Sequence, residues 1–325
     1  MSHTAVAKAH ANIALVKYWG KKNDDLRIPW CSNISMTLQD YWTETRFIAQ
    51  PQESSRTFFL NGEEIHDDAA SRVIRYIDRL QQHYHLTGGY TIISNNHVPL
   101  SAGFASSASG FAALAGSFAA AYELDVTQRE LTQLARLGSG SASRSIYGGF
   151  VKWVAGTDHQ SSFAYPLDEY PSCDITVISV TLNTRGKKIS STEAMRRSVA
   201  SPYFPTWVTE CNQCCTLMET AIHNNDFTTI GQLAQQNAIE MHAMTLCTQP
   251  GFTYFTPQTL AITNFIQQLC DNGLECYWTC DAGPNPKILV QASHQQEVIT
   301  QLTAAFPHLT YETTTFGPGI EIRHE

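Results

Sequence analysis

Apolar and β-branched residues recur in short runs along the N-terminal part of the chain. Residues 8–20 contain the apolar run Ile13–Val16, which predicts a buried strand that ends at a turn. Lys17, Tyr18 and Trp19 would emerge at the end of that strand. The stretches Ile34–Leu38 and Glu44–Ile48 alternate in the manner of two antiparallel strands. The sequence therefore predicts an antiparallel sheet near the start of the chain.

A hairpin and an amphipathic helix follow. Thr57–Leu60 is followed by Asn61-Gly62, a dipeptide typical of a hairpin turn. Residues 69–85 then place apolar side chains at helical spacing, which predicts a helix that packs on the sheet. We expect the three arginines of this helix to form its solvated face; they are Arg72, Arg75 and Arg79.

The stretch Pro99–Ala121 joins a predicted strand to a predicted helix through small residues. Tyr90–Ser94 has the composition of a strand, and the alanine-rich Phe111–Ala121 has that of a helix. Glycines and serines between them offer backbone N–H groups and hydroxyls at the positive end of the helix, where phosphate binds well. The segment lacks the GK[ST] of a Walker loop, and a capped core helix is the alternative interpretation.

Composition limits the classes of protein that the chain can belong to. Its 325 residues are 43% hydrophobic and 15% charged, enough for one large or two moderate domains with a sizeable core. The net charge of −8 disfavours a general nucleic-acid binder. The N-terminal residues do not have the pattern of a signal peptide, and we find no run of about 20 apolar residues that would span a membrane.

Cysteine and histidine spacing favours reduced thiols over a metal site. The nine cysteines include a CxxCC at Cys211, Cys214 and Cys215, but no second CxxC or spaced histidine pair accompanies it. We assign no residue to a metal. Buried, reduced thiols are typical of a cytosolic protein, and we expect a cytoplasmic location.

The second half of the chain begins after a shift in composition. Residues 165–174 are rich in proline and acidic side chains, and we place the domain boundary there, between units 1–172 and 173–325. Strands are predicted at Ile175–Thr181 and Glu275–Cys280, with helices between them and a final pair of strands near Thr310 and Ile320. The turn DAGPNP at 281–286 separates two strands, and a lone aspartate there more often caps a turn than catalyses.

Five separate stretches resemble one enzyme family. PxxxGxxSSA (99–108) resembles the nucleotide-phosphate loop of the GHMP kinase superfamily, with Phe104 where that superfamily usually has leucine. Together with four other stretches it resembles the diphosphomevalonate decarboxylases, in the order of that family and over nearly the whole chain. The stretches are ANIALVKYWGKK (11–22), PLSAGFASSASG (99–110), RLGSGSASRSIYGGF (136–150), KKISSTEAM (187–195) and WTCDAGPNPKILV (278–290).

The resemblance implies a fold, cofactors and an oligomer. The fold would be the α+β GHMP kinase fold, with an N-terminal ATP-loop domain, a C-terminal α/β sandwich-like domain and the active site in the cleft between them. ATP and Mg²⁺ would serve the ATP-dependent decarboxylation of mevalonate 5-diphosphate to isopentenyl diphosphate, and the chain would act as a homodimer without nucleic-acid or membrane partners.

The resemblance also implies a role for each matching residue. Asp281 would orient or deprotonate the 3-hydroxyl, Arg144 would clamp the substrate carboxylate, and Lys17 would hold charge near the reacting oxygen. The substrate diphosphate would be held by Tyr18, Lys21, Ser139, Ser141 and Ser191, with Ser190 as the alternative to Ser191. The ATP site would comprise Ser94, Asn96, Ser101, Ala102, Gly103, Ser106, Ser107 and Ser109, and Ser107 would also position the phosphates for transfer.

Three other functions are compatible with part of this pattern. A kinase that phosphorylates mevalonate at the 3-hydroxyl and stops is disfavoured by Asp281. A decarboxylase of the monophosphate would be expected to lack Lys21 and Ser141, which are both present. A metabolite sensor would be expected to have a degraded loop or to lack Asp281. It also remains open whether Trp30 and Cys31, which depart from the family's small polar stretch, reshape the pocket.

Overall fold

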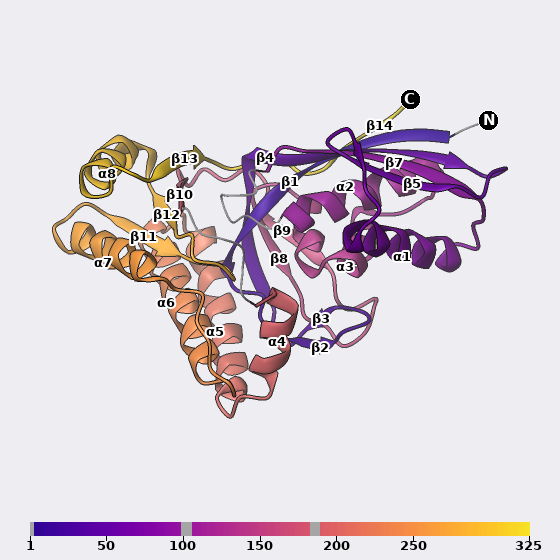
Figure 1. Cartoon of the computed structure of the whole chain (residues 1–325). Helices are drawn as coiled ribbons and strands as arrows, with labels where there is room; N and C mark the ends of the chain where they lie inside the picture. Colours follow the sequence, from indigo (N-terminus) through magenta and orange to yellow (C-terminus); the bar gives the residue numbers. More distant parts are fainter. Residues whose placement is uncertain (1–2, 99–105, 183–188) are drawn as a thin grey trace.

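Two long strands, β1 (His3–Val16) and β4 (Asn33–Gln50), run side by side through the N-terminal lobe (Figure 1). They pair antiparallel from His3 opposite Ala49 to Val16 opposite Ile34, with irregular register after His10. The two strands expected within residues 34–48 are therefore one continuous strand, which is a correction. The structure, a computed structural model, describes residues 3–98, 106–182 and 189–325.

These strands belong to a sheet of eight strands in the order β14-β1-β4-β7-β5-β6, with β8 and β9 attached at β4. The predicted hairpin is confirmed, because Asn61 and Gly62 both have positive φ angles, of 52° and 86°, in the turn between β5 and β6. The pairing of β5 with β7 is parallel, and the remaining pairings are antiparallel. The other strands are β5 (Arg56–Leu60), β6 (Glu63–Glu64), β7 (Gly89–Asn96), β8 (Phe150–Trp153), β9 (Ala164–Asp168) and β14 (Glu321–His324).

Three helices, α1 (Asp68–His83), α2 (Ser106–Ala121) and α3 (Gln128–Gly138), pack on this sheet (Figure 1). The predicted alanine-rich helix is confirmed as α2, and it begins five residues earlier than expected. Its buried alanines lack bulky side chains, which lets the helix lie close against β1 and β4. Phe118 fills the space between them and packs edge-on against Phe47, with 5.4 Å between ring centroids.

The C-terminal lobe is built on a second, antiparallel sheet in the order β11-β12-β10-β13. Helix α6 contacts both β11 of this sheet and β1 of the N-terminal lobe, and α5 packs beside α6. Helices α7 and α8 lie at the far end of the molecule (Figure 1). The strands are β10 (Thr176–Thr181), β11 (Cys276–Thr279), β12 (Lys287–Val290) and β13 (Thr310–Thr314). The helices are α4 (Ser191–Val199), α5 (Phe204–His223), α6 (Phe227–Leu246), α7 (Pro257–Asp271) and α8 (Ala292–Ala305).

The end of the chain returns to the N-terminal lobe. The final two strands do not pair with each other as expected, because β13 pairs with β10 and β14 pairs with β1. One hydrophobic core also spans both lobes: Leu15 and Trp19, at the end of β1, pack in the same cluster as Trp207 and Met218 of α5. These contacts hold the two lobes together around the end of β1.

The predicted boundary between residues 172 and 173 falls in the segment that joins β9 to β10. Within the described ranges, the helices do not include one with the apolar length that a membrane span requires. All nine cysteines are unpaired thiols, and seven of them are buried.

Replacing Phe118 tests the contact between α2 and the sheet. Phe118→Ala should lower the free energy of unfolding by about 3–5 kcal/mol, because it leaves a cavity among Phe47, Tyr122 and the alanines. Tyr170→Ala is the matched control, since Tyr170 is 88% exposed and its loss should change stability by less than about 0.5 kcal/mol. Urea unfolding of both variants measures the difference, and equal stabilities would contradict the packing.

Candidate active site

The end of β1 and the turn after β11 meet between the two lobes. Lys17 follows β1 directly, and its Nζ lies 2.8 Å from Oδ1 of Asp281 and 2.7 Å from the carbonyl oxygen of Ala14. The Lys17 side chain is 2% exposed, whereas that of Asp281 is 29% exposed. A buried ammonium loses its hydration and needs a charged partner, which Asp281 supplies. The ion pair therefore places an oriented carboxylate at a surface that solvent and a ligand can reach.

A cavity of about 320 Å³ surrounds this ion pair. The structure brings together in its wall every residue predicted to be catalytic or to bind substrate. These are Lys17, Tyr18, Lys21, Ser107, Ser139, Ser141, Arg144, Ser191 and Asp281. They come from five separate segments of the chain, so the cavity exists only in the folded protein.

Arg144 lies in the 3₁₀ helix η2 (Gly140–Ile146) and is 2% exposed. Its guanidinium donates to the side-chain amide oxygens of Asn33 and of Asn12, the latter at 3.0 Å. Burial lowers the pKa of Arg144 to about 10, with the Asp281 carboxylate opposing the shift, so the side chain stays charged near neutral pH. Its buried Nε has no hydrogen-bond partner among the described residues. The guanidinium is thus a fixed cation suited to a planar carboxylate.

A row of hydroxyl groups lines another part of the wall. Ser107 Oγ lies 3.3 Å from Ser139 Oγ, which lies 3.4 Å from Ser141 Oγ. The ring of Tyr18 packs against Trp153, and its buried hydroxyl has no hydrogen-bond partner in the described parts of the chain. Burial raises the pKa of Tyr18, so its hydroxyl remains a donor. Such a row of neutral donors suits phosphate oxygens.

Gly140 makes room for the Tyr18 ring. A Cβ on Gly140 would lie 2.7 Å from the nearest ring carbon, so any other residue would displace the tyrosine. Gly140, the second glycine of the GSGSASRS stretch, is therefore needed for close packing. Its small size lets η2 bring Ser141 and Arg144 to the cavity.

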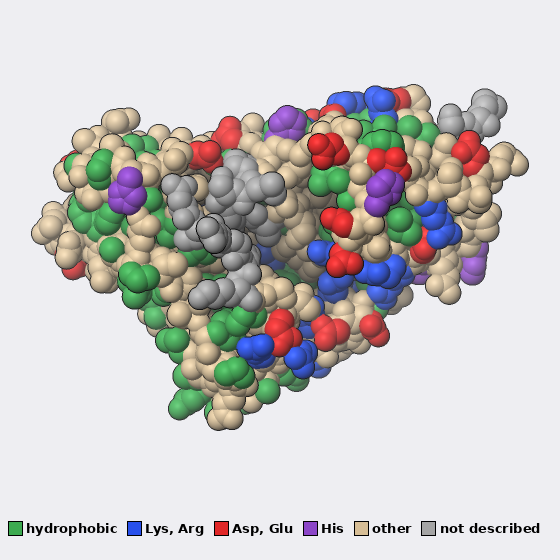
Figure 2. Space-filling model, in the orientation of Figure 1, with side chains coloured by type: hydrophobic (Ala, Val, Ile, Leu, Met, Phe, Trp, Pro, Cys, Tyr) green, Lys and Arg blue, Asp and Glu red, His purple; other side chains and the backbone are tan. Residues whose placement is uncertain are grey.

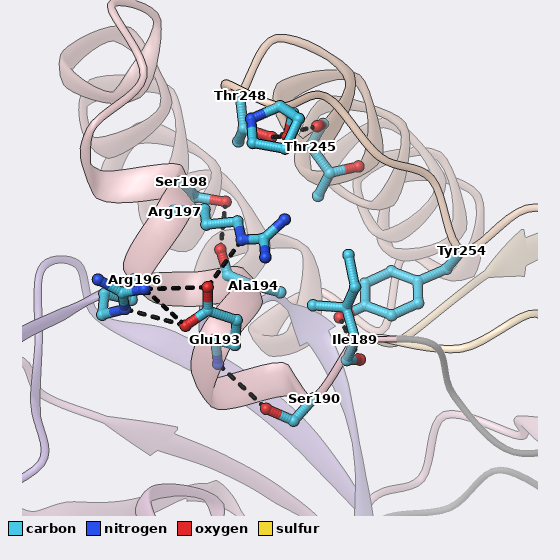
Figure 3. Close-up of polar contacts among 11 residues, drawn as sticks. Ile189, Ser190, Glu193, Ala194, Arg196, Arg197, Ser198, Thr245, Thr248 and Tyr254 are labelled. Atoms are coloured by element: carbon cyan, nitrogen blue, oxygen red, sulfur yellow. Dashed lines mark hydrogen bonds and ion pairs between the residues drawn. The ribbon is translucent and has the colours of Figure 1, made fainter.

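The two candidate serines lie at the start of α4, where Figure 3 shows Ser190 at the cap of the helix. Ser190 accepts a hydrogen bond from the backbone N–H of Glu193 at 3.2 Å and so caps the helix. Ser191 is the first residue of the helix and also lines the cavity, but its side chain does not cap the helix. Glu193 in turn holds Arg196 and Arg197 in ion pairs of 2.9 and 2.8 Å, away from the cavity.

Two arginines that we expected elsewhere, or did not single out, also line the cavity. Arg72 of α1 donates to the carbonyl oxygen of Gly138 at 2.9 Å, and Arg27 donates from Nε to that of Leu137 at 2.8 Å. Arg72 is exposed, as expected for the solvated face of α1, but the end of α3 brings a carbonyl acceptor to it, so the arginine also borders the cavity. Lys21 also lies at this part of the cavity, with its Nζ 3.1 Å from Asp24.

His242 of α6 supports the turn that carries Asp281. Its Nε2 lies 3.3 Å from the carbonyl oxygen of Cys280, which can only accept, so Nε2 carries the proton. Burial, and to a smaller extent the nearby Lys17 ammonium, lower the pKa of His242 to about 4, so the imidazole is neutral at physiological pH. From the same helix, Asn237 accepts the backbone N–H of Lys17 at 2.7 Å. These two side chains align the turn with the end of β1.

The predicted ATP-binding residues differ in what their side chains contact. Ser106 and Ser107 begin α2, whereas the hydroxyls of Ser94 and Ser109 pair with strand threonines at 2.8 Å. Asn96 accepts a hydrogen bond from Thr43 at 3.1 Å. Ser101, Ala102 and Gly103 lie outside the described residues. The assignment of this set to ATP stays a prediction.

Sequence reasoning missed the side chains that support the site. Asn12 and Asn33 fix Arg144, while Asn237 and His242 fix Lys17 and the turn. Asn12 carries a signal, since an amide inside the apolar run of β1 must find polar partners. Asn33, Asn237 and His242 contact partners that are distant in the sequence, and no local sequence pattern distinguishes them.

Two family models match the chain. One is described as the diphosphomevalonate decarboxylase-like N-terminal domain and matches residues 9–164; the other, the mevalonate 5-diphosphate decarboxylase C-terminal domain, matches residues 176–321. The chain belongs to the diphosphomevalonate decarboxylase family. The resemblance predicted from the five stretches is confirmed.

Relatives and solved structures agree with this family. A diphosphomevalonate decarboxylase of Ganoderma lucidum is 33% identical over 97% of this chain and 85% of its own length. A crystal structure of mevalonate diphosphate decarboxylase from Staphylococcus aureus superposes with a TM-score of 0.96 at 36% identity, over 99% of this chain and 98% of that one. The predicted α+β GHMP kinase fold is thereby confirmed.

Two further matches bear on ligands. A structure described as MDDEF in complex with MVAPP, AMPPCP and magnesium is 35% identical with a TM-score of 0.94, over 100% of both chains. A phosphomevalonate decarboxylase of Haloferax volcanii is 26% identical over 97% of this chain and 95% of its own length. Family members thus differ in the number of phosphates on the substrate that their names state.

The buried His242 should make stability sensitive to acid. Its pKa is lowered from 6.5 to about 4 in the folded state, so the unfolded chain binds the additional proton between these values. The free energy of unfolding should fall as the pH drops from 6.5 towards 4, by up to about 1.4 kcal/mol per pH unit for this one group. Urea unfolding across this pH range measures the slope.

His242→Gln is the matched variant, because glutamine retains a donor for the Cys280 carbonyl but does not titrate. The slope of its stability against pH should be smaller than that of the wild type by up to one proton. Parallel curves for the two proteins would contradict a neutral, buried His242.

Proposed function

We propose that this chain catalyses the ATP-dependent decarboxylation of mevalonate 5-diphosphate to isopentenyl diphosphate, in the mevalonate pathway of isoprenoid biosynthesis. The observation that carries the proposal is the Asp281 carboxylate, oriented by Lys17 in a cavity that also presents Arg144 and a row of hydroxyls. The γ-phosphoryl group of ATP passes to the tertiary 3-hydroxyl oxygen. The C3–O bond then breaks with loss of phosphate, and the electrons of the C1–C2 bond form the new double bond as carbon dioxide leaves.

Asp281 is assigned to the substrate 3-hydroxyl. A general base must reach the proton that it accepts, and Asp281 is the partly exposed member of its ion pair with Lys17. Lys17 holds the carboxylate in one orientation and keeps positive charge beside the oxygen that receives the phosphoryl group. Hydroxide is a poor leaving group even from a tertiary carbon, so the phosphate ester made at this step is what allows the later loss of carbon dioxide.

Arg144 is assigned to the substrate carboxylate. Its guanidinium is held by Asn12 and Asn33 before any ligand arrives, so little reorganisation is needed on binding. Release of carbon dioxide requires the C1–C2 bond to be aligned with the breaking C3–O bond. A fixed, planar guanidinium suits that alignment better than a mobile ammonium would.

The substrate diphosphate is assigned to neutral donors and one lysine. Tyr18, Ser139, Ser141 and Ser191 offer hydroxyls in the same cavity, and Lys21 offers an ammonium. The ammonium of Lys21 is paired with the exposed Asp24, at 3.1 Å, and a diphosphate would compete for it. Of the two candidate serines, Ser191 is favoured, because Ser190 caps α4.

ATP and Mg²⁺ are assigned to the N-terminal end of α2. Backbone N–H groups at the start of a helix favour phosphate, and Ser107 places a hydroxyl there that also contacts Ser139 of the substrate side. The donors fit a nucleotide phosphate. Mg²⁺ neutralises charge on the phosphates in such transfers and commonly binds through phosphate oxygens and water.

Three properties of the whole chain belong to the same proposal. We expect residues 1–172 to act as the ATP-binding unit and residues 173–325 as the unit that closes over the substrate. The unpaired cysteines are compatible with a reducing, cytoplasmic location. We expect a homodimer, and the exposed Leu217, Leu246 and Leu260 of α5, α6 and α7 offer apolar surface for contact.

The decisive experiment offers the purified protein three substrates. With Mg²⁺ and ATP, we expect ADP and carbon dioxide to appear in equal amounts with mevalonate 5-diphosphate, and little of either with mevalonate or its 5-phosphate. A coupled ADP assay and a carbon dioxide assay, run in parallel, measure both products. ADP without carbon dioxide would indicate a kinase, activity confined to the monophosphate would indicate the other decarboxylase, and no product would favour a sensor.

A further inference from the structure

Two cysteine thiols meet where the two lobes join. Cys31 follows the short hairpin of β2 (Lys21–Asn23) and β3 (Ile28–Pro29) in the N-terminal lobe, and Cys211 lies on α5 of the C-terminal lobe. Their sulfur atoms are 3.0 Å apart, whereas a disulfide bond measures about 2.0 Å. Both residues are buried in the hydrophobic core that spans the lobes. A shift of about 1 Å would therefore bring the two sulfurs to bonding distance.

The other two cysteines of the CxxCC have different partners. Cys215 lies one turn after Cys211 on α5, and its thiol donates to the carbonyl oxygen of Ser32 at 3.0 Å. The Cys214 thiol lies 3.9 Å from the carbonyl oxygen of Leu233. The motif thus directs one thiol to Cys31 and the other two to the backbone.

Both members of the pair contact groups that hold the catalytic side chains. Asn33, the first residue of β4, donates to the carbonyl oxygen of Cys31 at 3.4 Å and accepts a hydrogen bond from Arg144. The Cys211 thiol lies 3.6 Å from the carbonyl oxygen of Lys17. Cys31 itself is not part of the cavity wall. A movement of the two sulfurs would therefore reach the site through the backbone of Lys17 and through Asn33.

The surroundings of the pair make it slow to react. A cysteine reacts as the thiolate, which neighbouring cations stabilise. Figure 2 shows Lys and Arg side chains gathered around α1 on the N-terminal lobe, whereas the pair lies among other thiols. The contact with Cys31, and then burial, raise the pKa of Cys211 well above its usual range. Oxidation therefore requires sustained exposure to an oxidant small enough to enter the core.

We infer that Cys31 and Cys211 are a modification site, which hydrogen peroxide oxidises to a disulfide that lowers the activity of the enzyme. One sulfur attacks a peroxide oxygen, the O–O bond breaks, and a sulfenic acid and water form. The second thiol then displaces the hydroxyl group, so that the S–S bond forms, the S–O bond breaks and a second water leaves. The two thiols lose two electrons and two protons, and the peroxide is reduced to water.

The disulfide links the two lobes covalently beside the catalytic cavity. Its formation draws Cys31 towards α5, together with the carbonyl oxygen that holds Asn33. It also removes the S–H proton that Cys211 directs to Lys17. Arg144 and Lys17 then lose part of their fixed orientation, and a displacement of about 1 Å in a site can lower the rate about 100-fold.

Mass spectrometry of the peroxide-treated protein identifies the bond. After the free thiols are alkylated, digestion with trypsin and a glutamate-specific protease should give residues 28–44 joined to residues 211–219. Cys31→Ala and Cys211→Ala should each abolish the joined peptide, and Cys215→Ala, the matched control on the same helix, should retain it. Absence of the joined peptide from the wild type, or its persistence in Cys211→Ala, would overturn the assignment.

Carbon dioxide formation from mevalonate 5-diphosphate and ATP tests the effect on activity. Peroxide should lower the rate of the wild type about 10- to 100-fold, and dithiothreitol should restore it by thiol–disulfide exchange. Cys31→Ala should start within about threefold of the wild type and should keep its activity under the same treatment. Cys211→Ala serves in the same way if Cys31→Ala does not fold.

A loss of activity that dithiothreitol does not reverse, or that Cys31→Ala shares, would contradict the role of this pair. Such a loss would indicate oxidation elsewhere, for instance of Met195 and Met241 in the cavity wall. A joined peptide without any change in activity would also contradict it. An untreated wild type that forms no carbon dioxide would refute the proposed function, and the joined peptide would still test the modification.

Discussion

The ion pair between Lys17 and Asp281 is the interaction on which the site depends. It joins the end of the central strand β1 to a turn 264 residues later, and it buries the ammonium almost completely. Loss of either partner would leave an uncompensated charge in a place that solvent barely reaches on the lysine side. The surrounding structure limits the freedom of both ends: Asn237 holds the backbone of Lys17, His242 holds the turn, and one hydrophobic core runs between the lobes at this point.

Charge is arranged in the cavity according to what each part of the substrate would need. The buried Arg144 is held by neutral amides, so its charge remains available to a carboxylate. The hydroxyl row and Tyr18 offer donors without charge, and Lys21, Arg27 and Arg72 add cations at the side of the cavity beside α1. An acidic protein can therefore present a strongly basic site, because the local field and not the total charge governs ligand binding.

Much of the site was predictable because its residues lie in short, contiguous motifs. GSGSASRS supplies Ser139, Ser141 and Arg144 within six residues, and the end of the apolar run at Val16 places Lys17 at a strand end. The supporting side chains were not predictable, since Asn33, Asn237 and His242 gain their meaning only from partners more than 35 residues away. The second contact of Arg72 was not predictable for the same reason: helical periodicity identified its exposed position, but not the end of α3 that lies against it.

The fold shows the same division between local and distant information. Periodicity located the helices and the Asn61-Gly62 hairpin, which depend on neighbours in the chain. Periodicity did not identify the strand that pairs with β14. Whether β14 pairs with β13 or with β1 depends on how the whole C-terminal lobe folds. Periodicity also divided β4 at its exposed residues 39–40, although the pairing with β1 resumes beyond its irregular middle.

Single turnover by Asp281→Asn tests most directly whether the Asp281 carboxylate acts on the reacting hydroxyl. Asparagine keeps the shape of the side chain but removes its charge and basicity. With saturating ATP and mevalonate 5-diphosphate, formation of ADP and of carbon dioxide should both slow by about 10²- to 10⁴-fold, while displacement of a fluorescent nucleotide still reports ATP binding. Turnover close to that of the wild type in a correctly folded variant would contradict the role assigned to Asp281.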